Sequence, residues 1–359
     1  MTKTPQAEKC LTHYNDLLAK AFEVPVHALA KQFSVSEPME MVLRKALLDS
    51  SEFLGAITCL DVDQIVGQVV QVGVGGLYTG RKVDGRFTKE SGVDGNKFAL
   101  AETDSCVRIS WTTLCTWANS GNPGQFVQLM SEFTNQTFAL DMLRIGFNGT
   151  HVATTSDPAT YPLGEDVNIG WQQLAREWNG GSQIITAEAG DKIYFDPDGA
   201  GDYATLDEMA SDLINSKIHS AYRNDPRLVV IVGTGLIAAS QAKLYSQATK
   251  PTEQIAAQQL DKSIAGRKAY IAPFFPENGM WVTTLANLHI YTQRNTRKRK
   301  AEDNDQTKGF ENSYWRYEGY AIGDYLAFGS YEEADVEIGA RPEAPASGEP
   351  APEDEPAVA

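Results

Sequence analysis

The most regular pattern of apolar residues lies near the middle of the chain, between residues 122 and 148. Apolar side chains recur there every three or four positions, which places them on one stripe of an α-helix. Pro123 suits the first turn of such a helix and Gly149 its end. A rise of about 1.5 Å per residue makes this helix longer than roughly 30 Å. The residues of the stripe are Phe126, Leu129, Met130, Phe133, Leu140, Leu143 and Phe147.

Two shorter helical patterns precede this long helix. Residues 7–21 have apolar positions at helical spacing, and a second run extends from Met39 to Phe53. Helices this short need a partner surface to be stable. We therefore interpret roughly the first fifty residues as an arm that packs against another surface.

Residues 56–110 have the pattern of β-strands. The stretches "AITCLDVDQIVGQVVQVGVGG" and "KFALAETDSCVRISWTTL" are rich in β-branched residues, and between them lies "LYTGRKVDGRFTKESGVDGN", rich in Gly and charge. The simplest interpretation is two long antiparallel strands joined by an exposed loop. Because a loop of about 20 residues is unusual inside a compact domain, we expect an extended hairpin that reaches a partner subunit.

The second half of the chain mixes helical and strand patterns, and it contains no sequence repeat. Thr205 and Glu208 fit the capping box of a helix, and residues 228–232 have the pattern of a buried strand. "TQRNTRKRKAEDNDQTKG", residues 292–309, is typical of a charged loop. The remaining expected elements are a helix at 171–178, a strand near 192–196, a polar helical region from 236 to 263, strands at 268–273 and 280–291, and aromatic strand at 314–333.

Composition narrows the class of protein. The chain has 359 residues, of which 42% are hydrophobic and 22% charged, as is ordinary for a globular protein. No apolar run is long enough to span a membrane, and the N-terminus lacks the apolar core of a secretory signal. The four cysteines, Cys10, Cys59, Cys106 and Cys115, form no CxxC pair, so we expect reduced thiols in a cytoplasmic product.

The net charge of −16 argues against a surface that wraps nucleic acid by neutralising phosphates. It does not exclude DNA that is forced into proximity. Part of the charge lies in residues 341–359, which hold five acids, five prolines and one Arg. This composition cannot bury enough apolar surface to fold, so we expect a disordered tail.

One candidate ligand site is Gly233-x-Gly235-x-x-Ala238, which follows the buried strand. A dinucleotide-binding fold needs a second strand after the helix and an acid about 20 residues further on. Residues 241–265 instead have a polar helical pattern, and Asp261 falls inside it. We therefore interpret the glycines as a tight turn that caps a helix.

Two further motifs are incomplete. Residues 75–82 have the glycine spacing of a phosphate loop, but they end in Arg-Lys where Lys and then Ser or Thr are required. Asp196 and Asp198 match part of a calcium loop, but Ala200 replaces one ligand and Asp207 the bidentate Glu. Both stretches are expected to be turns.

The remaining candidate motifs also fit a structural role better than a catalytic or ligand-binding one. The basic run at 294–300 is followed at once by "AEDND", which offsets most of its charge, so a solvated loop is expected. No nucleophile elbow occurs. We predict no catalytic, cofactor-binding or metal site, and a non-enzymatic protein with protruding parts. The five histidines, which have no metal-binding spacing, are His13, His27, His151, His219 and His289.

The order of these elements resembles the major capsid fold of tailed phages and herpesviruses. More specifically, the chain resembles the major capsid proteins of peduoviruses, phage P2 and its relatives. The matching stretches follow the same order from about residue 40 to 330. They are "DSSEFL", "GFNG", "TSDP", "DVNIGW", "GDYATLDE", "DPRLVVIVG", "PFFPENGM", "LANLHIY" and "FENSYWRYEGYAIGDY".

This resemblance implies an α+β fold and a division of the chain into named parts. By the resemblance, the strand at 228–232 and the glycine turn near residue 233 belong to the A-domain, and no cofactor is implied. The expected parts are an N-arm at 1–33, an N-terminal helical segment at 34–59, an E-loop at 60–110, a P-domain with a spine helix at 111–164, an A-domain at 165–285, returning P-domain strands at 286–331, and a disordered acidic tail at 332–359.

The function implied is self-assembly, as hexamers and pentamers, into an icosahedral shell around packaged double-stranded DNA in the bacterial host cytoplasm. Expected partners are further copies of the chain, a scaffolding protein that is also the prohead protease, and a portal protein. In this family the protease commonly removes the N-arm, and "KQFSV" places the cut near Gln32, Phe33 and Ser34. The expected E-loop tip contacts are Arg81, Lys82, Asp84, Arg86, Lys89 and Glu90.

Two alternatives and one further expectation accompany this interpretation. An encapsulin-like nanocompartment shell would keep the fold, and a bound cargo enzyme would favour it. A nucleotide-binding oxidoreductase would use Gly233 and Gly235, and a nicotinamide cofactor that shifts the melting temperature would favour it. The shell is expected to be non-covalent, because no motif assigns an Asn to Lys82, Lys89 or Lys97 for an isopeptide bond.

Overall fold

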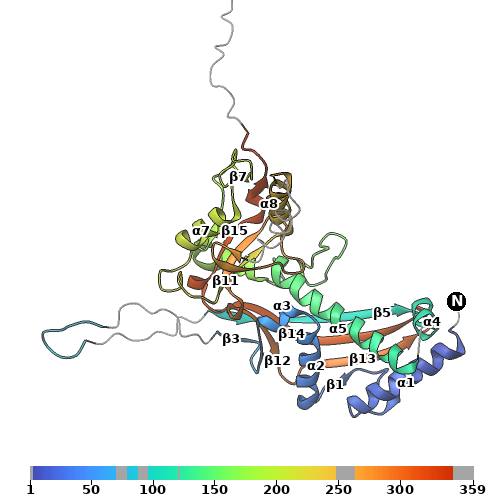
Figure 1. Cartoon of the computed structure of the whole chain (residues 1–359). Coiled ribbons are helices and arrows are strands. Elements are labelled where there is room, and N and C mark those ends of the chain that lie inside the picture. Colours follow the sequence, from blue (N-terminus) through green and yellow to red (C-terminus); the bar gives the residue numbers. More distant parts are fainter. Residues whose placement is uncertain (1–2, 70–78, 88–95, 120–121, 248–262, 343–359) are drawn as a thin grey trace, which may run out of the picture.

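The computed structural model describes residues 3–69, 79–87, 96–119, 122–247 and 263–342. These residues form two bodies, each built on a six-stranded sheet. The first body lies along the lower part of Figure 1 and carries the N-terminus, and the second rises above it. None of the helices in the described part is long and apolar enough to cross a membrane.

The first body is organised around one long strand, β14 (Gly309–Ile322). β13 (Lys298–Asn304) and β12 (Leu288–Gln293) pair antiparallel with successive halves of β14, and β5 (Ala101–Ser110) pairs antiparallel along its other edge. β2 (Thr58–Val62) adds to β12 in parallel. The short strand β1 (Phe33–Ser34) closes the other edge of the sheet by pairing antiparallel with β13.

Helices cover this sheet, and the longest is α5 (Pro123–Asn148), which Figure 1 shows running beside β5. Asn122 caps its first turn, since its side chain accepts a hydrogen bond from the amide of Gln125. Of the predicted stripe, Leu129 and Leu140 are half-buried and Phe133 is 44% exposed, and the buried members are Phe126, Met130, Leu143 and Phe147. The other helices of this body are α1 (Pro5–Ala21), α2 (Glu37–Asp49), α3 (Glu52–Ala56) and α4 (Trp111–Asn119).

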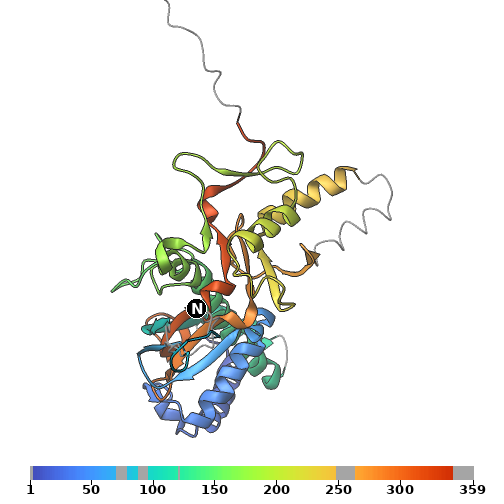
Figure 2. The same ribbon diagram turned by 90° about the vertical axis from the view of Figure 1, so that its left-hand side faces the viewer.

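The second body has a mixed sheet with β8 (Leu228–Val232) at its centre, and all five residues of β8 are buried. α7 (Leu206–Ser216) and α8 (Thr234–Gln247) pack on it (Figure 2). The predicted capping box of Thr205 and Glu208 is confirmed at the start of α7. The sheet order is β6 (Ile184–Ile185), β15 (Gly329–Tyr331), β11 (Met280–Thr284), β8, β10 (Arg267–Tyr270) and β9 (Ser263–Ile264).

The remaining short elements join and extend the two bodies. α6 (Trp171–Glu177) packs against α5, and β7 (Ile193–Phe195) pairs in parallel with β16 (Val336–Ile338) at the top of the second body. The 3-10 helices are η1 (Val26–Ala28), η2 (Trp178–Gly181), η4 (Leu285–Asn287), η5 (Tyr325–Ala327) and η6 (Glu333–Asp335).

The expectation of two long antiparallel strands over residues 56–110 is wrong. Among the described residues of this stretch, only β3 (Val66–Gln68) and β4 (Lys97–Ala99) pair with each other. β2 and β5 pair instead with β12 and β14, because those returning strands offer longer ladders. The stretch at 280–291 also divides, since β11 and β12 belong to different sheets.

Three other expectations differ from the structure. The helical run at 39–53 breaks at Ser50, and Ser51 caps α3. The charged stretch at 292–309 contains β13, so it is not a loop. Residues 332–342, which we placed in the disordered tail, include β16, and Arg341 forms ion pairs with Asp191 and Asp202. The expected disorder of 343–359 lies outside the described residues, as do 248–262 of the expected long helix.

Candidate functional site

A loop connects β3 to β4, and its described tip lies away from the end of the first body that carries α4 (Figure 1). It leaves the body through β3 and returns through β4. Every residue of its described tip, 79–87, is exposed. Exposed apolar side chains such as Val83, which is 100% exposed, favour contact with a partner surface.

The tip has a defined turn. The ring of Phe87 lies over Gly80, where an added Cβ would come within 2.7 Å of it. Gly85 has φ +87°, a left-handed conformation that favours glycine. Val83, at the turn, is 100% exposed. The structure therefore presents two apolar side chains, Val83 and the less exposed Phe87, among charged ones at the end of the projection.

Four of the six predicted tip residues lie in this turn, namely Arg81, Lys82, Asp84 and Arg86, and all four are exposed. Lys89 and Glu90 lie outside the described residues. Residues 79–87 carry three cations and one anion, so the described tip is positively charged in a chain whose net charge is −16.

The base of the loop is anchored firmly to the sheet. Phe98 of β4 stacks on Tyr291 of β12 with ring centroids 4.5 Å apart. The side-chain amide of Asn96 donates to the carbonyl oxygens of Ile322 (3.3 Å) and Gly323 (3.0 Å), at the end of β14. These contacts fix the direction in which the loop leaves the first body.

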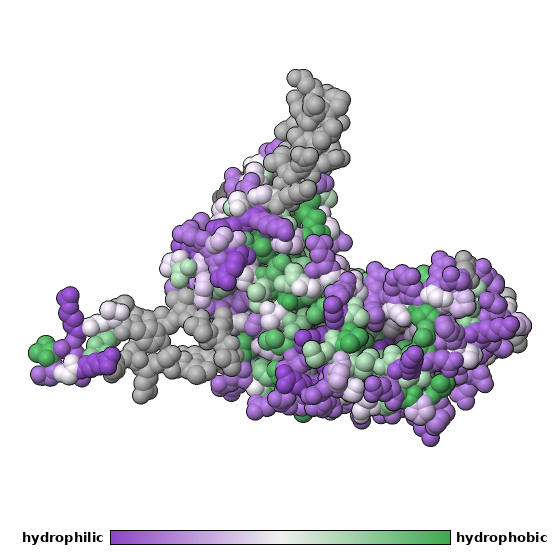
Figure 3. Space-filling view, turned by 60° about the horizontal axis from the view of Figure 1, so that its bottom comes forward, coloured by the Kyte–Doolittle hydropathy of each residue, from purple (hydrophilic) through white to green (hydrophobic). Residues whose placement is uncertain are grey.

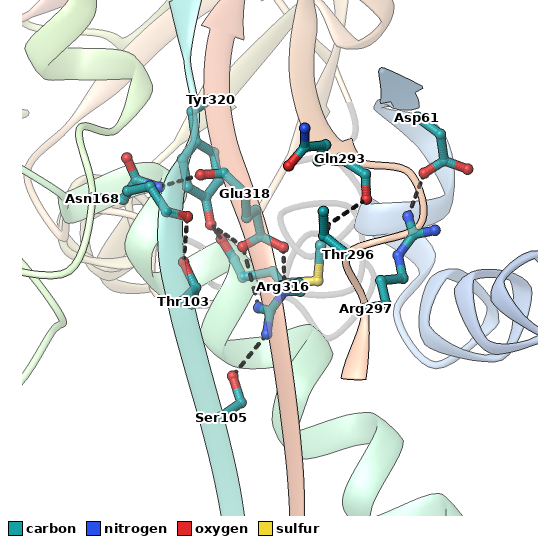
Figure 4. Close-up of polar contacts among 12 residues, drawn as sticks. Asp61, Thr103, Ser105, Asn168, Gln293, Thr296, Arg297, Arg316, Glu318 and Tyr320 are labelled. Carbon is teal, nitrogen blue, oxygen red and sulfur yellow. Dashed lines mark hydrogen bonds and ion pairs between the residues drawn. The ribbon is translucent and has the colours of Figure 1, made fainter. Parts of the chain in front are cut away.

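A buried ion pair lies in the sheet beside this base (Figure 4). Nε of Arg316 donates to Oε2 of Glu318 at 2.6 Å, and both side chains are 1% exposed. Burial alone would lower the pKa of Arg316, but the attraction of Glu318 outweighs it and raises that pKa. Burial, followed by the charge of Glu318, raises the pKa of Tyr320, whose hydroxyl lies 3.2 Å from that carboxylate.

A second buried arginine ties the N-terminal segment to the sheet. Arg297, 2% exposed, donates to Glu40 of α2 at 2.8 Å and also contacts Asp61 of β2 (Figure 4). Arg44 of α2 donates to the other oxygen of Asp61 at 2.7 Å. The expectation of a solvated loop at 294–300 is therefore wrong, because Arg297 and Arg299 are buried structural cations. Each carboxylate oxygen of Asp61 therefore accepts from one of the two arginines.

The predicted cleavage residues lie at the edge of this sheet. Gln32 and Ser34 are exposed, and Phe33 is half-buried, with its ring 5.5 Å from that of Phe22. Phe33 and Ser34 form β1, an extended edge strand paired only with β13. The helix before them is not a free arm, because Cys10 and Tyr14 of α1 are 0% and 2% exposed in the core of the first body.

A cavity of about 490 Å³ lies between β5, the end of α5 and residues 152–167. Four acids, Glu102, Asp104, Asp141 and Asp166, and one cation, Arg144, line it. Burial raises the pKa of Asp141, and the neighbouring Arg144 only partly offsets this. Its ion pair with Arg144 measures 3.5 Å. The cavity is therefore acidic.

Comparison with known proteins identifies the chain. The family described as "Phage major capsid protein, P2 family" matches residues 10–334. This chain belongs to that family. The capsid protein of Escherichia phage P2 is 29% identical to it over 320 residues, which cover 83% of this chain and 86% of that protein. The major capsid protein of Serratia phage KSP20 is 27% identical over 313 residues, covering 83% and 88%.

A solved structure extends this finding to the fold. A chain from the structure described as the satellite phage P4 procapsid including size determination (Sid) protein is 27% identical, with a TM-score of 0.72. The match covers 92% of this chain and 98% of that chain. The expected capsid fold and the expected function are confirmed. The chain is a major capsid protein, a component of the virion capsid that forms the procapsid shell from many copies.

The glycine turn of this capsid protein serves packing. A Cβ added at Gly233 would come within 2.1 Å of the carbonyl oxygen of Glu277, so the turn at 276–279 occupies the space beside it. The amide of Gly235 donates to that same carbonyl at 3.0 Å, and the amide of Gly233 to Gly279 at 2.9 Å. In a dinucleotide site these amides would face phosphate. The structure and the family both favour the shell over the oxidoreductase.

The incomplete calcium loop is a turn in this capsid protein, as predicted. The carboxylate of Asp196 accepts from the amides of Asp198 (3.1 Å) and Ala200 (3.0 Å). Asp198 points to solvent, with its side chain 87% exposed. No group of three or more potential metal ligands occurs among the residues that the structure describes. The acidic cavity and the buried arginines were not found from the sequence, because both depend on contacts between distant segments.

Proposed function

We propose that this capsid protein assembles as hexamers and pentamers into an icosahedral shell that encloses packaged double-stranded DNA. The projecting loop is the observation that carries the proposal. Its exposed tip has two apolar and four charged side chains and no partner surface among the described residues of its own chain. A neighbour in a ring supplies such a surface for every copy, and head-to-tail contacts between identical chains form such rings when the rotation between them closes.

The two bodies have different positions in such a ring. We assign the second body to the A-domain, which meets its symmetry mates at the centre of each ring, and the first body to the P-domain. The long helix α5 is then the spine helix, and the projection is the E-loop. β15 and β16 pair within the second body, so the A-domain also contains residues 329–338.

The N-terminal segment is proposed as the site of maturation. A scaffolding protein that is also the prohead protease cuts near Gln32, Phe33 and Ser34, and a portal protein occupies one vertex. The extended, edge-strand conformation of β1 supports this, because the cut residues are exposed at a sheet edge. The mass of the chain from mature particles tests it. The proposal requires the loss of Met1 to about Lys31, and an intact N-terminus contradicts it.

The shell encloses the packaged DNA and does not bind it sequence-specifically. The net charge of −16 means that packaged phosphate is repelled rather than held. Assembly takes place in the host cytoplasm, where the four thiols stay reduced, and no disulfide joins any of them. An inner face rich in Arg and Lys in an assembled particle would contradict this view.

Negative-stain electron microscopy of the protein co-expressed with its neighbouring genes tests the proposal. Closed particles of uniform diameter are expected. Monomers or small oligomers in the presence of a scaffold partner would contradict it. Purified particles with a cargo enzyme in place of DNA would favour the nanocompartment shell instead.

A further inference from the structure

The first helix, α1, is part of the core of the body that it precedes. It packs against α4 and α5, and its Tyr14 lies edge-on to Phe310 of β14, with ring centroids 5.8 Å apart. The side-chain amide of Asn312 donates to the hydroxyl of Tyr14 at 3.5 Å. Five residues of α1 are at most 5% exposed, namely Ala7, Cys10, Leu11, Tyr14 and Ala19.

The surface that receives α1 is itself apolar. The helix shares its hydrophobic cluster with side chains of β5, α4, α5 and β14, among them Ile109, Leu114, Phe126, Met130 and Phe310. The opposite side of α1 is exposed and mainly polar, and Figure 3 shows a mainly polar surface, with smaller apolar patches, over the end of the first body that carries α1. Departure of the helix would therefore expose apolar area on both contacting faces.

Polar contacts hold the start of this segment. Lys3 forms an ion pair with Asp303, and its Nζ lies 5.0 Å from the centre of the Trp111 ring. The amide of Thr4 donates to Sγ of Cys115 in α4 at 3.4 Å. The N-terminal segment is thus attached to the first body from residue 3 onward.

The proposed cleavage residues lie beyond these contacts. On one side of them, the carbonyl of Leu29 accepts from the amide of Ala301 at 2.8 Å. On the other side, the amide of Val35 donates to the carbonyl of Arg297 at 3.0 Å. Hydrolysis of one peptide bond between these two anchors breaks none of the contacts of α1.

We propose that the peptide produced by that cut, residues 1 to about 32, stays bound to the surface formed by α4, α5 and β14. This inference rests on the proposed cleavage, and it goes further by naming what covers the first body of the mature shell. Each copy in the shell then consists of two chains. The cut ends the covalent connection of α1 to β1, and the core of the first body stays closed.

A disulfide formed after the cut tests the position of the peptide. Thr4→Cys places a thiol beside Cys115, and Cys10→Ala in the same chain leaves the peptide with that one thiol. Cut shells are purified and then treated with a mild oxidant such as diamide. The mass of the chain is expected to rise by the mass of the peptide, to return on reduction, and to stay unchanged with Cys115→Ser.

The control for this test lies on the same helix. Thr12 is on the exposed side of α1, so Thr12→Cys in place of Thr4→Cys should give no adduct with Cys115. A peptide that is merely enclosed in the shell would react equally through either thiol. Equal adducts from the two variants would therefore overturn the proposal.

The unassembled chain provides a second test. A recognition sequence for a site-specific protease, inserted between Lys31 and Gln32, allows the purified full-length chain to be cut. Size-exclusion chromatography is expected to show one peptide per chain in the peak of the body. Leu11→Asp should lower this amount by about tenfold or more, because it brings a charge into the apolar cluster. Leu17→Asp, at a position 40% exposed, is the matched control and should retain the peptide.

The outcomes separate this retention from the proposed function. A peptide that elutes apart from the cut chain, or cut shells that give no adduct with Thr4→Cys, would overturn the retention and leave the shell function intact. Equal losses in Leu11→Asp and Leu17→Asp would overturn it as well. If Leu11→Asp does not fold, the disulfide test decides, since it keeps the apolar side of α1. Shells whose chains keep an intact N-terminus would contradict the proposed cleavage, and the inserted sequence would still test the retention.

Discussion

The two bodies of this capsid protein are stabilised differently. The first body buries three guanidinium groups, those of Arg297, Arg299 and Arg316, each at most 6% exposed. The second body has at its centre a strand of five buried apolar residues, Leu228–Val232, under apolar faces of α7 and α8. The first body thus adds buried ionic contacts to its apolar core, whereas the second body buries no Arg or Lys side chain among its described residues.

This difference follows from how each body is assembled from the sequence. Arg297 holds Glu40 and Asp61, more than two hundred residues away, so ionic contacts fasten the N-terminal segment to strands from the end of the chain. In the second body the central strand and α8 are adjacent in sequence. Ion pairs have fixed geometry and can therefore define one arrangement of distant segments, whereas apolar surfaces tolerate several.

The largest expected effect concerns the buried ion pair of the first body, and its absence would contradict the difference between the two bodies. Glu318→Ala leaves Arg316 buried without its carboxylate partner, so the free energy of unfolding is expected to fall by about 3–5 kcal/mol. Denaturant unfolding of unassembled subunits measures this. The matched control is Glu332→Ala, which removes an exposed pair with Arg176 and should cost only about 0.2–1 kcal/mol. Equal losses would show that the first body does not depend on its buried ions.

A smaller effect is expected at the start of α7, which packs on the second sheet. Thr205→Ala removes the oxygen that accepts from the amide of Glu208 (3.2 Å), and should lower the free energy of unfolding by about 0.5–2 kcal/mol. Thr205→Ser keeps that acceptor and should lose much less. Thermal unfolding of the two variants distinguishes them, and an equal loss in both would assign the effect to the methyl group instead.

A comparable or slightly smaller effect is expected in the centre of the second sheet. Ile231→Val deletes one methylene from a side chain that is 0% exposed, and should cost about 0.5–1.5 kcal/mol. Ile271→Val, at a position 55% exposed, should change the free energy of unfolding by less than about 0.5 kcal/mol. A loss at Ile271 equal to that at Ile231 would contradict the assignment of the core.

The smallest expected effect concerns Glu40, the buried acid that pairs with Arg297 in the first body. Burial raises the pKa of Glu40 above its ordinary value despite the attraction of Arg297, and the nearby Asp61 adds to the rise. The folded chain therefore binds this proton more tightly than the unfolded chain, so the contribution is present below about pH 4.5 and is lost as pH rises through the raised pKa. The melting temperature of the unsubstituted chain minus that of Glu40→Gln should therefore fall from pH 4 to pH 7, and a difference that stays constant would contradict the raised pKa of Glu40.

The sequence predicted those parts of the fold that depend on neighbouring residues. The long helix at 123–148, the capping box of Thr205 and the buried strand at 228–232 each have a local pattern, and the structure has all three. The motifs shared with peduovirus major capsid proteins additionally predicted the order of the domains along the chain. The turn at Gly233 was also predicted, but its cause, the carbonyl of Glu277 beside it, could not be.

The rest could not be predicted because it depends on pairing across the chain. Residues 298–304 have a charged composition typical of a solvated loop, yet they form β13, because Glu40 and Asp61 neutralise Arg297 and Asn312 accepts from Arg299 at 2.8 Å. Phe133 fits the helical stripe but faces outward beside Trp117. The acidic cavity draws on three segments of the first half of the chain, and no local pattern indicates that they meet.

A single-particle reconstruction of assembled shells tests the central claim most directly, because it shows which surfaces of neighbouring copies meet. The account predicts rings of six and five copies, with the second body of each chain at the centre and the tip at 79–87 in contact with another copy. Rings in which each tip contacts its own chain, or particles built only from two-fold contacts, would contradict it.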